Sequence, residues 1–256
     1  MIKLENVSMS YPVAGLKSHS LQARMYHRLS KVVGGSLALD APTTHVHALK
    51  NINLEIQEGQ RVGIYGHNGA GKTTLLRVLS KVYTPTSGRA IIKGRINALT
   101  DFTLGMEPDA TGIKNIIFRL IFMGYTFKEA KASVDAIADF AELGDFIHLP
   151  IRTYSTGMFM RLAFAISTHF MPDILILDEM IGTGDEAFKE KCKQRTQDLF
   201  QQSRIIVLST HDVASLKEYC DTVVIMEHGE IVNVFKDNTF QKNIQKKEQD
   251  TMAVEI

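Results

Sequence analysis

The stretch YGHNGAGKTT, residues 65 to 74, places small residues, a lysine and two hydroxyl groups directly after the apolar run RVGIY. Its loop consists of Gly66, His67, Asn68, Gly69, Ala70, Gly71, Lys72, Thr73 and Thr74. Glycines at this spacing let successive backbone N–H groups turn inward around phosphate oxygens, where side chains would collide with the ligand. A helix beginning at Lys72 would add its positive end, and the Thr73 hydroxyl would ligate Mg²⁺. This is the P-loop pattern, and it predicts a site for a nucleoside triphosphate with Mg²⁺.

Two adjacent acids end a second apolar run, MPDILILDEM. At the carboxyl end of a parallel strand, Asp178 and Glu179 would face the crevice where ligands of such sheets bind. We expect Asp178 to hold Mg²⁺, through the water shell of the ion. Glu179 would orient and deprotonate the attacking water. Taken alone, Glu179 could equally cap the next helix, but the P-loop upstream favours the catalytic role.

A histidine ends a third run, RIIVLSTHD. His211 follows Ser209 and Thr210 at the same predicted sheet edge, where it could contact the γ-phosphate and sense whether it is present. By contrast, His45 and His47 form a bare HxH pattern without further ligands nearby, which argues against a metal site there.

Two observations argue against a GTPase. The stretch DATG, residues 109 to 112, imitates a GTPase switch motif, but it follows Pro108 rather than a strand. In addition, the sequence contains no stretch similar to the NKxD motif that reads guanine. The P-loop is therefore expected to serve another nucleotide.

The stretch TYSTGMFMRLAFAIS, residues 153 to 167, opens an apolar helix with small hydroxyl residues and a glycine. The Ser155 hydroxyl and the Gly157 N–H would be donors at the positive end of this helix, which predicts a second phosphate clamp. The clamp belongs to a helical region away from the P-loop of the same chain. We therefore expect it to close over the nucleotide of a second copy.

A sheet must bring these groups together. The runs RVGIYG, DILILD, RIIVLST and DTVVIM alternate with helical stretches, which predicts a parallel sheet covered by helices on both faces. The stretches IKLENVS and ALKNINLEI alternate apolar and polar residues, as in an antiparallel flank. We predict an α/β P-loop fold in one domain, residues 1 to 235. Its core would span 1–100 and 166–235, with a helical subdomain at about 101–165 and a polar tail at 236–256.

A basic segment at about 15–46 interrupts the antiparallel flank, and no acid occurs between Glu5 and Asp40. Its cations include Lys17, Arg24, Arg28 and Lys31, and an apolar helical face would consist of Leu21, Met25, Leu29 and Val32. Two interpretations stay open. The segment is a surface helix packed on the domain, or a basic amphipathic helix near anionic lipid headgroups or a membrane partner.

Composition limits the possible functions. The 256 residues suffice for one large α/β domain, and a net charge of +1 argues against bulk electrostatic binding to nucleic acid. Cys192 and Cys220 lack metal-ligand spacing, which indicates a reducing cytoplasm. No uncharged apolar run reaches about 18 residues, so we expect any membrane role to come through a partner.

The P-loop, YSTGM, ILILDE and LSTHD, in this order, resemble the nucleotide-binding subunit of an ABC transporter over about residues 1 to 235. The usual signature of that family is LSGGQ, whereas this chain has YSTGM at residues 154 to 158. A YSSGM-like form resembles the exporters of capsular polysaccharide, O-antigen and teichoic acid. The stretches AELGDFIHLPIRTYSTGM, GTGDEAFKEKC and TGIKNI also resemble that subgroup, as does the basic insert.

The resemblance implies an ATPase in which two copies bind two ATP molecules at their interface. By motif, residues 66 to 74 would bind ATP and Mg²⁺, Asp178 would support the metal, Glu179 would be the base and His211 the switch histidine. Ser155, Thr156 and Gly157 would contact the nucleotide of the other copy.

Three further roles follow from the same resemblance. Asp185, in GTGD, would communicate across the dimer, and Tyr11 is the candidate for stacking on adenine. The usual Q-loop glutamine is missing, and Asp101 stands at about that place. Some members of the subgroup carry a further C-terminal sugar-binding domain, which we do not expect here.

For partners, the resemblance implies a homodimer on the cytoplasmic face of the bacterial inner membrane. Two six-span permease subunits would carry a lipid-linked polysaccharide, and no nucleic acid would be bound. One alternative is an ABC ATPase that drives export of a drug or small lipid. Another is a soluble ABC protein without transport, which commonly carries two cassettes, whereas this chain has one P-loop. A nucleotide-regulated scaffold without turnover is disfavoured by Glu179 and His211.

Overall fold

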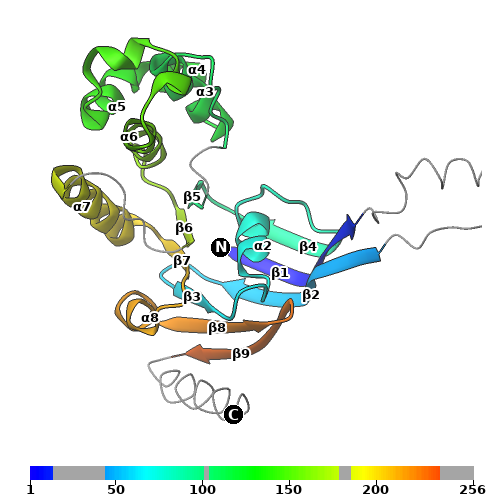
Figure 1. Ribbon diagram of the computed structural model, residues 1–256. Helices are drawn as coiled ribbons and strands as arrows, with labels where there is room; N and C mark the ends of the chain where they lie inside the picture. The colour runs from blue at the N-terminus through cyan, green and yellow to red at the C-terminus, as the bar shows by residue number, and fades with distance from the viewer. Residues whose placement is uncertain (14–43, 101–103, 179–185, 237–256) are drawn as a thin grey trace, which may run out of the picture.

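The computed structural model describes residues 1–13, 44–100, 104–178 and 186–236 (Figure 1). Several predicted features lie outside these ranges. They are most of the basic insert and of the polar tail, together with Asp101, Glu179 and Asp185. For the residues described, the predicted α/β P-loop fold with an antiparallel flank and an inserted helical region is confirmed.

A six-stranded sheet forms the centre of the molecule, in the order β5-β6-β7-β3-β8-β9. Its strands are β3 (Arg61–Tyr65), β5 (Ile96–Leu99), β6 (Ile174–Asp178), β7 (Ile205–Ser209), β8 (Thr222–Glu227) and β9 (Glu230–Lys236). The first five strands in this order pair in parallel, and β9 pairs antiparallel to β8. The carboxyl ends of β3, β6 and β7 therefore lie at the same edge of the sheet, where the candidate site was predicted.

A three-stranded antiparallel sheet flanks this centre, in the order β2-β1-β4. Its strands are β1 (Ile2–Val13), β2 (Thr44–Ile56) and β4 (Ser87–Ile92). The first two are longer than their alternating patterns predicted, because their pairing continues to the couple Val13 and Thr44. The insert between β1 and β2 thus starts and ends at neighbouring positions of a hairpin.

Helices cover both faces of the central sheet. Helix α2 (Lys72–Leu79) lies between the two sheets, where Leu75 and Leu76 are fully buried in the main core cluster. Helices α7 (Glu186–Gln202) and α8 (Val213–Tyr219) cover the opposite face through a second cluster that includes Leu199 and Leu216. Burial from both sides explains why β6 and β7 are continuously apolar rather than alternating.

Between β5 and β6 the chain forms a helical lobe, residues 104–167, which stands off the body of the molecule (Figure 1). Its elements are α3 (Gly112–Phe122), α4 (Phe127–Ala132), α5 (Val134–Ala141), the 3₁₀ turns η1 (Gly144–His148) and η2 (Ile151–Thr153), and α6 (Thr156–Ser167). Side-chain hydrogen bonds cap the N-termini of several of these helices. The Thr111 hydroxyl accepts from the Lys114 N–H, and Thr126 with Glu129 forms a capping box. No described helix has both the length and the apolar character needed to cross a membrane.

An aromatic cluster joins the lobe to the body. Phe164 of α6 is fully buried and packs against Phe188 of α7, with ring centroids 6.3 Å apart. Phe140 of α5 contacts both rings. This cluster fixes the direction of α6 and therefore the position of the residues at its start.

Replacing Phe164 by Ala should remove this anchor and leave a cavity, because the ring is fully buried. We expect the free energy of unfolding to fall by about 3–5 kcal/mol. Urea denaturation followed by circular dichroism measures it. As a matched control, Phe118→Ala on α3, where the ring is 46% exposed, should change stability by no more than about 0.5 kcal/mol. Equal losses in the two variants would contradict the anchoring role.

Candidate functional site

The loop between β3 and α2 needs its glycines for backbone reasons. Gly69 and Gly71 have φ angles of 84° and 101°, in the left-handed region that side chains disfavour. At Gly66 a Cβ atom would lie 2.4 Å from the Met226 carbonyl oxygen of β8. The loop is thus held closely against the sheet, and glycines occupy its left-handed positions, where a side chain would be disfavoured.

Lys72 bends its side chain back over this loop. Its ammonium donates to the carbonyl oxygen of Gly66 at 2.5 Å and to that of His67 at 3.1 Å. The Lys72 ammonium therefore lies within the loop, close to the start of α2. A cation and a helix N-terminus are the groups that the predicted phosphate site needs.

Thr73 connects the P-loop to the end of β6. Its hydroxyl donates to Asp178 Oδ2 at 3.1 Å. These two side chains come from residues 105 positions apart in the sequence, and the sheet brings them into direct contact. A hydroxyl and a carboxylate oxygen at this spacing are hard ligands that suit Mg²⁺, so the residues present fit the ion that the P-loop pattern implies.

His211 lies exposed just beyond β7, as its place in the sequence predicted. The residues on either side of it are held in place. The Thr210 N–H donates to the Ile64 carbonyl of β3 at 3.3 Å, and the Thr210 hydroxyl accepts from the Asp212 N–H at 3.0 Å. This keeps His211 at the same sheet edge as Asp178.

Asp212 caps the helix that follows this histidine. Its carboxylate accepts from the Ser215 N–H at 2.9 Å and from the Ala214 N–H at 3.2 Å. The hydrogen bond from the Ser215 hydroxyl, followed by the two backbone bonds, lowers the pKa of Asp212 below its ordinary value. The cap is therefore fully formed at neutral pH and is lost only as the pH falls through this lowered pKa.

The residues predicted as a second phosphate clamp lie at the start of α6. The Ser155 hydroxyl oxygen accepts from the Met158 N–H at 3.2 Å, which leaves its own proton free for a further acceptor. Ser155, Thr156 and Gly157 are all exposed. Ser155 and Gly157 border a hollow of about 610 Å³, which Asp145 and Arg161 also line.

Nothing local requires a glycine at position 157. A Cβ atom there would have only Ser155 Oγ within 4 Å, at 3.9 Å, and Gly157 does not have a positive φ. Glycine weakens a helix by about 1 kcal/mol relative to alanine. The described part of the chain therefore shows no local reason for a glycine at this position.

The two predicted phosphate sites of one chain do not meet. Figure 1 shows the start of α6 in the helical lobe, away from α2 and the loop before it. The structure thus brings together the P-loop, Asp178 and the end of β7, and it separates Ser155 and Gly157 from them.

Tyr11, the candidate for stacking on adenine, lies in β1 opposite Val46 of β2. Its ring meets Tyr83 edge-on, with centroids 5.9 Å apart. The Tyr83 hydroxyl in turn accepts from Arg77 of α2 at 3.1 Å. Tyr11 therefore packs against the segment that follows α2. Its contact with adenine stays a prediction.

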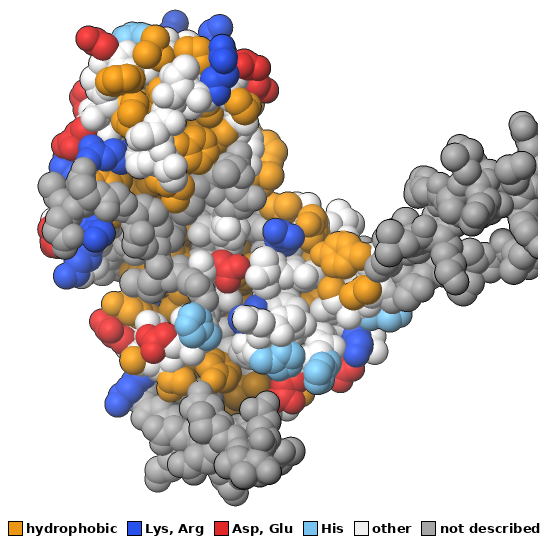
Figure 2. Space-filling model, viewed as in Figure 1, with side chains coloured by type: hydrophobic (Ala, Val, Ile, Leu, Met, Phe, Trp, Pro, Cys, Tyr) orange, Lys and Arg blue, Asp and Glu red, His pale blue; other side chains and the backbone are white. Residues whose placement is uncertain are grey.

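The structure also reveals a pair of histidines that no sequence motif connects. His67 of the P-loop and His228, in the turn between β8 and β9, lie with ring centroids 5.1 Å apart. The Gly229 N–H of that turn donates to the Ala70 carbonyl at 3.0 Å, which holds the turn against the loop. Figure 2 shows histidine side chains gathered on this lower part of the body. Among the described residues, no group of three potential His, Cys, Asp or Glu ligands could hold a metal ion.

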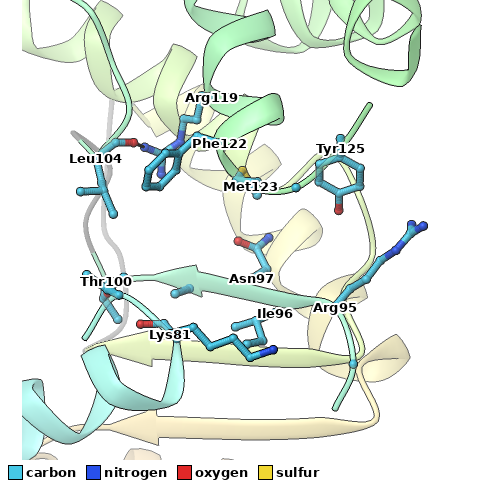
Figure 3. A pocket seen from close by; sticks show the side chains of 15 residues that line it. Lys81, Arg95, Ile96, Asn97, Thr100, Leu104, Arg119, Phe122, Met123 and Tyr125 are labelled. Atoms are coloured by element: carbon cyan, nitrogen blue, oxygen red, sulfur yellow. Dashed lines mark hydrogen bonds between the residues drawn. The ribbon is translucent and has the colours of Figure 1, made fainter. Parts of the chain in front are cut away.

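A hollow of about 300 Å³ separates the helical lobe from the edge of the central sheet (Figure 3). Lys81, Arg95 and Asn97 line it on the side of the body, and Phe122 and Tyr125 on the side of the lobe. Arg119 of α3 crosses its upper wall and donates to the Leu104 carbonyl and, at 3.1 Å, to Ser167 Oγ. The hollow combines cations with aromatic rings.

Comparison with known proteins places this arrangement in a family. The family model described as ABC transporter matches residues 49–182. The chain belongs to the ABC transporter family. ATP is the nucleotide of this family, and the chain is an ATPase.

Among its relatives, the O-antigen export system ATP-binding protein RfbE of Yersinia enterocolitica is 42% identical over 88% of this chain and 93% of that protein. RfbB of Myxococcus xanthus, with the same description, is 47% identical over 75% of this chain but 44% of its own length. The teichoic acids export ATP-binding protein TagH of Listeria monocytogenes is 39% identical over 72% of this chain and 55% of that protein. This ABC ATPase thus spans nearly all of one relative and about half of the other two.

Two solved structures show the fold. The ATP-binding cassette MJ0796, a dimer in a post-hydrolysis state bound to ADP and Pi, superposes with a TM-score of 0.64 at 23% identity. That comparison covers 92% of this chain and 98% of that one. The cbiO1 protein of Clostridium perfringens gives a TM-score of 0.56 at 20% identity, over 99% and 94% of the two chains.

Replacing Gly157 by Ala tests whether an outside group approaches the start of α6. Because a Cβ atom meets open space there, the free energy of unfolding should stay equal or rise by about 0.5–1 kcal/mol. ATP hydrolysis should fall by a factor on the order of 100, because the added methyl group would hold the phosphate away from the N–H donor at this position. Thermal unfolding and phosphate release measure the two effects. Full hydrolysis in this variant would show that nothing docks against Gly157.

Proposed function

We propose that this chain is the ATPase subunit of an exporter that moves a lipid-linked polysaccharide across the cytoplasmic membrane. The names of the relatives, which refer to export of O-antigen and of teichoic acids, support the cargo class. The observation that carries the proposal is the separation of two phosphate sites in one chain, each of which lacks the donors of the other. Such a chain works as a pair, and a pair can drive a membrane partner by opening and closing.

At the nucleotide, the loop from Gly66 to Thr74 holds the phosphates, and Lys72 turns from the loop carbonyls to the β- and γ-phosphates. Thr73 and Asp178, already in contact at 3.1 Å, are the residues that would hold Mg²⁺. When bound, that ion neutralises charge on the phosphate oxygens during hydrolysis. The fit of this donor pair to a hard cation supports the assignment.

Glu179, which follows Asp178 directly, would be the general base that accepts a proton from the attacking water. His211 at the neighbouring strand end would contact the γ-phosphate. Asp185 would communicate across the dimer, and Asp101 stands where the family has its Q-loop glutamine. Glu179, Asp185 and Asp101 lie outside the described residues, so their roles rest on the sequence motifs.

The partner copy completes each site. The Ser155 hydroxyl, whose proton is free, and the Gly157 N–H at the positive end of α6 would donate to the γ-phosphate of the other chain. Thr156, exposed between them, would join this contact. Each dimer then encloses two ATP molecules, and release of phosphate would reopen it.

Mixing two inactive variants tests this sharing directly. Lys72→Ala removes the phosphate contacts of the P-loop, and Ser155→Arg blocks the clamp, so each homodimer should lose ATP hydrolysis. In a heterodimer, one of the two sites unites an intact P-loop with an intact clamp. An equal mixture should therefore regain about a quarter of the wild-type rate, because half of the dimers form one good site of two. Phosphate release against mixing ratio measures it, and no recovery at any ratio would exclude a shared site.

The membrane partner would be a pair of six-span permease subunits, reached on the cytoplasmic face of the inner membrane. The hollow between lobe and body offers a place for a cytoplasmic segment of such a permease (Figure 3). Its cations Lys81 and Arg95 suit acidic groups, and Phe122 with Tyr125 suits apolar side chains. The neighbouring surface of α3 exposes Phe118 and Ile121, which extends the apolar area.

The cargo is tested in cells that carry Glu179→Gln in place of the native gene. Without the proposed base, hydrolysis should stop while ATP binding persists, so surface polysaccharide should disappear and its lipid-linked precursor should accumulate inside. Immunoblots of surface glycan and extraction of lipid-linked sugars measure this. Glu190→Gln, an exposed carboxylate of α7, is the matched control and should export normally. Unchanged surface polysaccharide in the Glu179→Gln cells would assign the chain to another cargo.

A further inference from the structure

Ser209, the last residue of β7, carries a hydroxyl with no partner. Its side chain is fully buried, and Ser209 Oγ makes no hydrogen bond with any described residue. Buried hydroxyl groups are nearly always paired, because leaving one unpaired destabilises the fold. An aliphatic residue, as at the other positions of this strand, would avoid that loss. The serine therefore needs an explanation outside the folding of the chain alone.

The register of the sheet places this hydroxyl beside the nucleotide site. Ser209 pairs with Asp178 of β6 on one side and with Ile64 of β3 on the other. Neighbouring strands lie about 4.8 Å apart. The only polar one of these two neighbours is Asp178.

The alternation of side chains shows which way both groups face. Ile176 of β6 and Val207 of β7 belong to the core cluster that packs against Leu75 and Leu76 of α2. Residues two positions further along a strand lie on the same face. Asp178 and Ser209 therefore both face α2, on the side from which Thr73 reaches Asp178.

Asp178 has room for another donor. In the structure its Oδ2 accepts from the Thr73 hydroxyl at 3.1 Å. An ionised carboxylate has about four acceptor positions, so one further hydrogen bond is available to a neighbouring hydroxyl. When Thr73 turns its oxygen toward a cation, it gives up this donation, and the carboxylate loses the group that orients it.

We propose that Ser209 is a positioning residue that donates its hydroxyl to the Asp178 carboxylate when Thr73 turns to Mg²⁺. The inference rests on the proposed function, in which Thr73 and Asp178 hold the ion. Thr73 orients Asp178 before the nucleotide arrives, and Ser209 does so afterwards. The hydroxyl that has no partner among the described residues would gain one when the nucleotide and Mg²⁺ are bound.

The experiment measures how strongly Mg²⁺ tightens nucleotide binding. A fluorescent N-methylanthraniloyl derivative of ATP is titrated into the full-length protein, first with EDTA and then at increasing Mg²⁺. Ser209→Ala is compared with Ser209→Thr, which keeps the hydroxyl. Ser203→Ala, which removes a hydroxyl just before β7, at the opposite end of the strand, is the matched control. Asp178→Asn serves as the reference for loss of the ion site, and thermal unfolding without nucleotide is recorded for all variants.

We expect Ser209→Ala to need about tenfold more Mg²⁺ for half of the tightening, as for loss of one hydrogen bond to a charged group. Its affinity in EDTA should equal that of the wild type, and its unfolding temperature without nucleotide should be equal or higher. Ser209→Thr and Ser203→Ala should keep the wild-type Mg²⁺ dependence.

Two results would overturn the inference. One is an unchanged Mg²⁺ dependence in Ser209→Ala, and the other is an equal loss of affinity with and without Mg²⁺, which a merely structural role would give. If Asp178→Asn abolishes the Mg²⁺ effect while Ser209→Ala leaves it unchanged, the inference fails and the ion site stands. If Asp178→Asn also leaves the effect unchanged, the proposed ion site itself fails.

Discussion

The hydrogen bond between Thr73 and Asp178 is the contact on which the nucleotide site depends. It can form only if β3 and β6 run in parallel, end at the same edge and leave α2 on the face between the two sheets. Each of these conditions has its own physical cause. Burial on both faces selects apolar strands, and left-handed backbone at Gly69 and Gly71 turns the chain sharply from β3 into α2.

A second constraint separates the chain into a body that contains the P-loop and a helical lobe that contains Ser155 and Gly157. The lobe has its own core, and its link to the body includes the cluster of Phe140, Phe164 and Phe188. Phe188 lies in α7, which begins directly after residues 179–185. Packed rings therefore link α6 to the helix that follows the predicted base. Protein interiors are packed as densely as organic crystals, so a displacement of α6 would be passed on to α7 rather than absorbed.

Much of the site was visible in the sequence, because its chemistry needs particular residues at particular spacings. The glycines, Lys72, Thr73 and Asp178 were predicted on that ground, and the four apolar runs predicted their strands. The sequence could not show that Gly66 is also required by the Met226 carbonyl, or that His228 lies beside His67. Both facts come from strands brought together by pairing, and pairing partners leave no local pattern. The short strand β5, with four residues, gave too little signal to be recognised.

The proposed role of Ser209 could not be predicted from the sequence, for a related reason. A serine before Thr210 and His211 looks like an ordinary end of a strand, and only complete burial without a partner makes it conspicuous. Likewise, an exposed glycine at the start of a helix is unremarkable until its surroundings prove empty, as at Gly157. In both cases the informative observation is that the local structure gives no reason for the residue type, which composition and periodicity do not report.

The hairpin of β1 and β2 holds residues 14–43 between two paired positions, Val13 and Thr44. Because the cost in free energy of closing a loop grows only slowly with its length, the number of residues between Val13 and Thr44 has little effect on the stability of the two sheets. The segment can thus be shortened, exchanged between relatives or replaced by a reporter domain without reshaping the sheet below. The insert therefore places little constraint on the sheets that hold the nucleotide site.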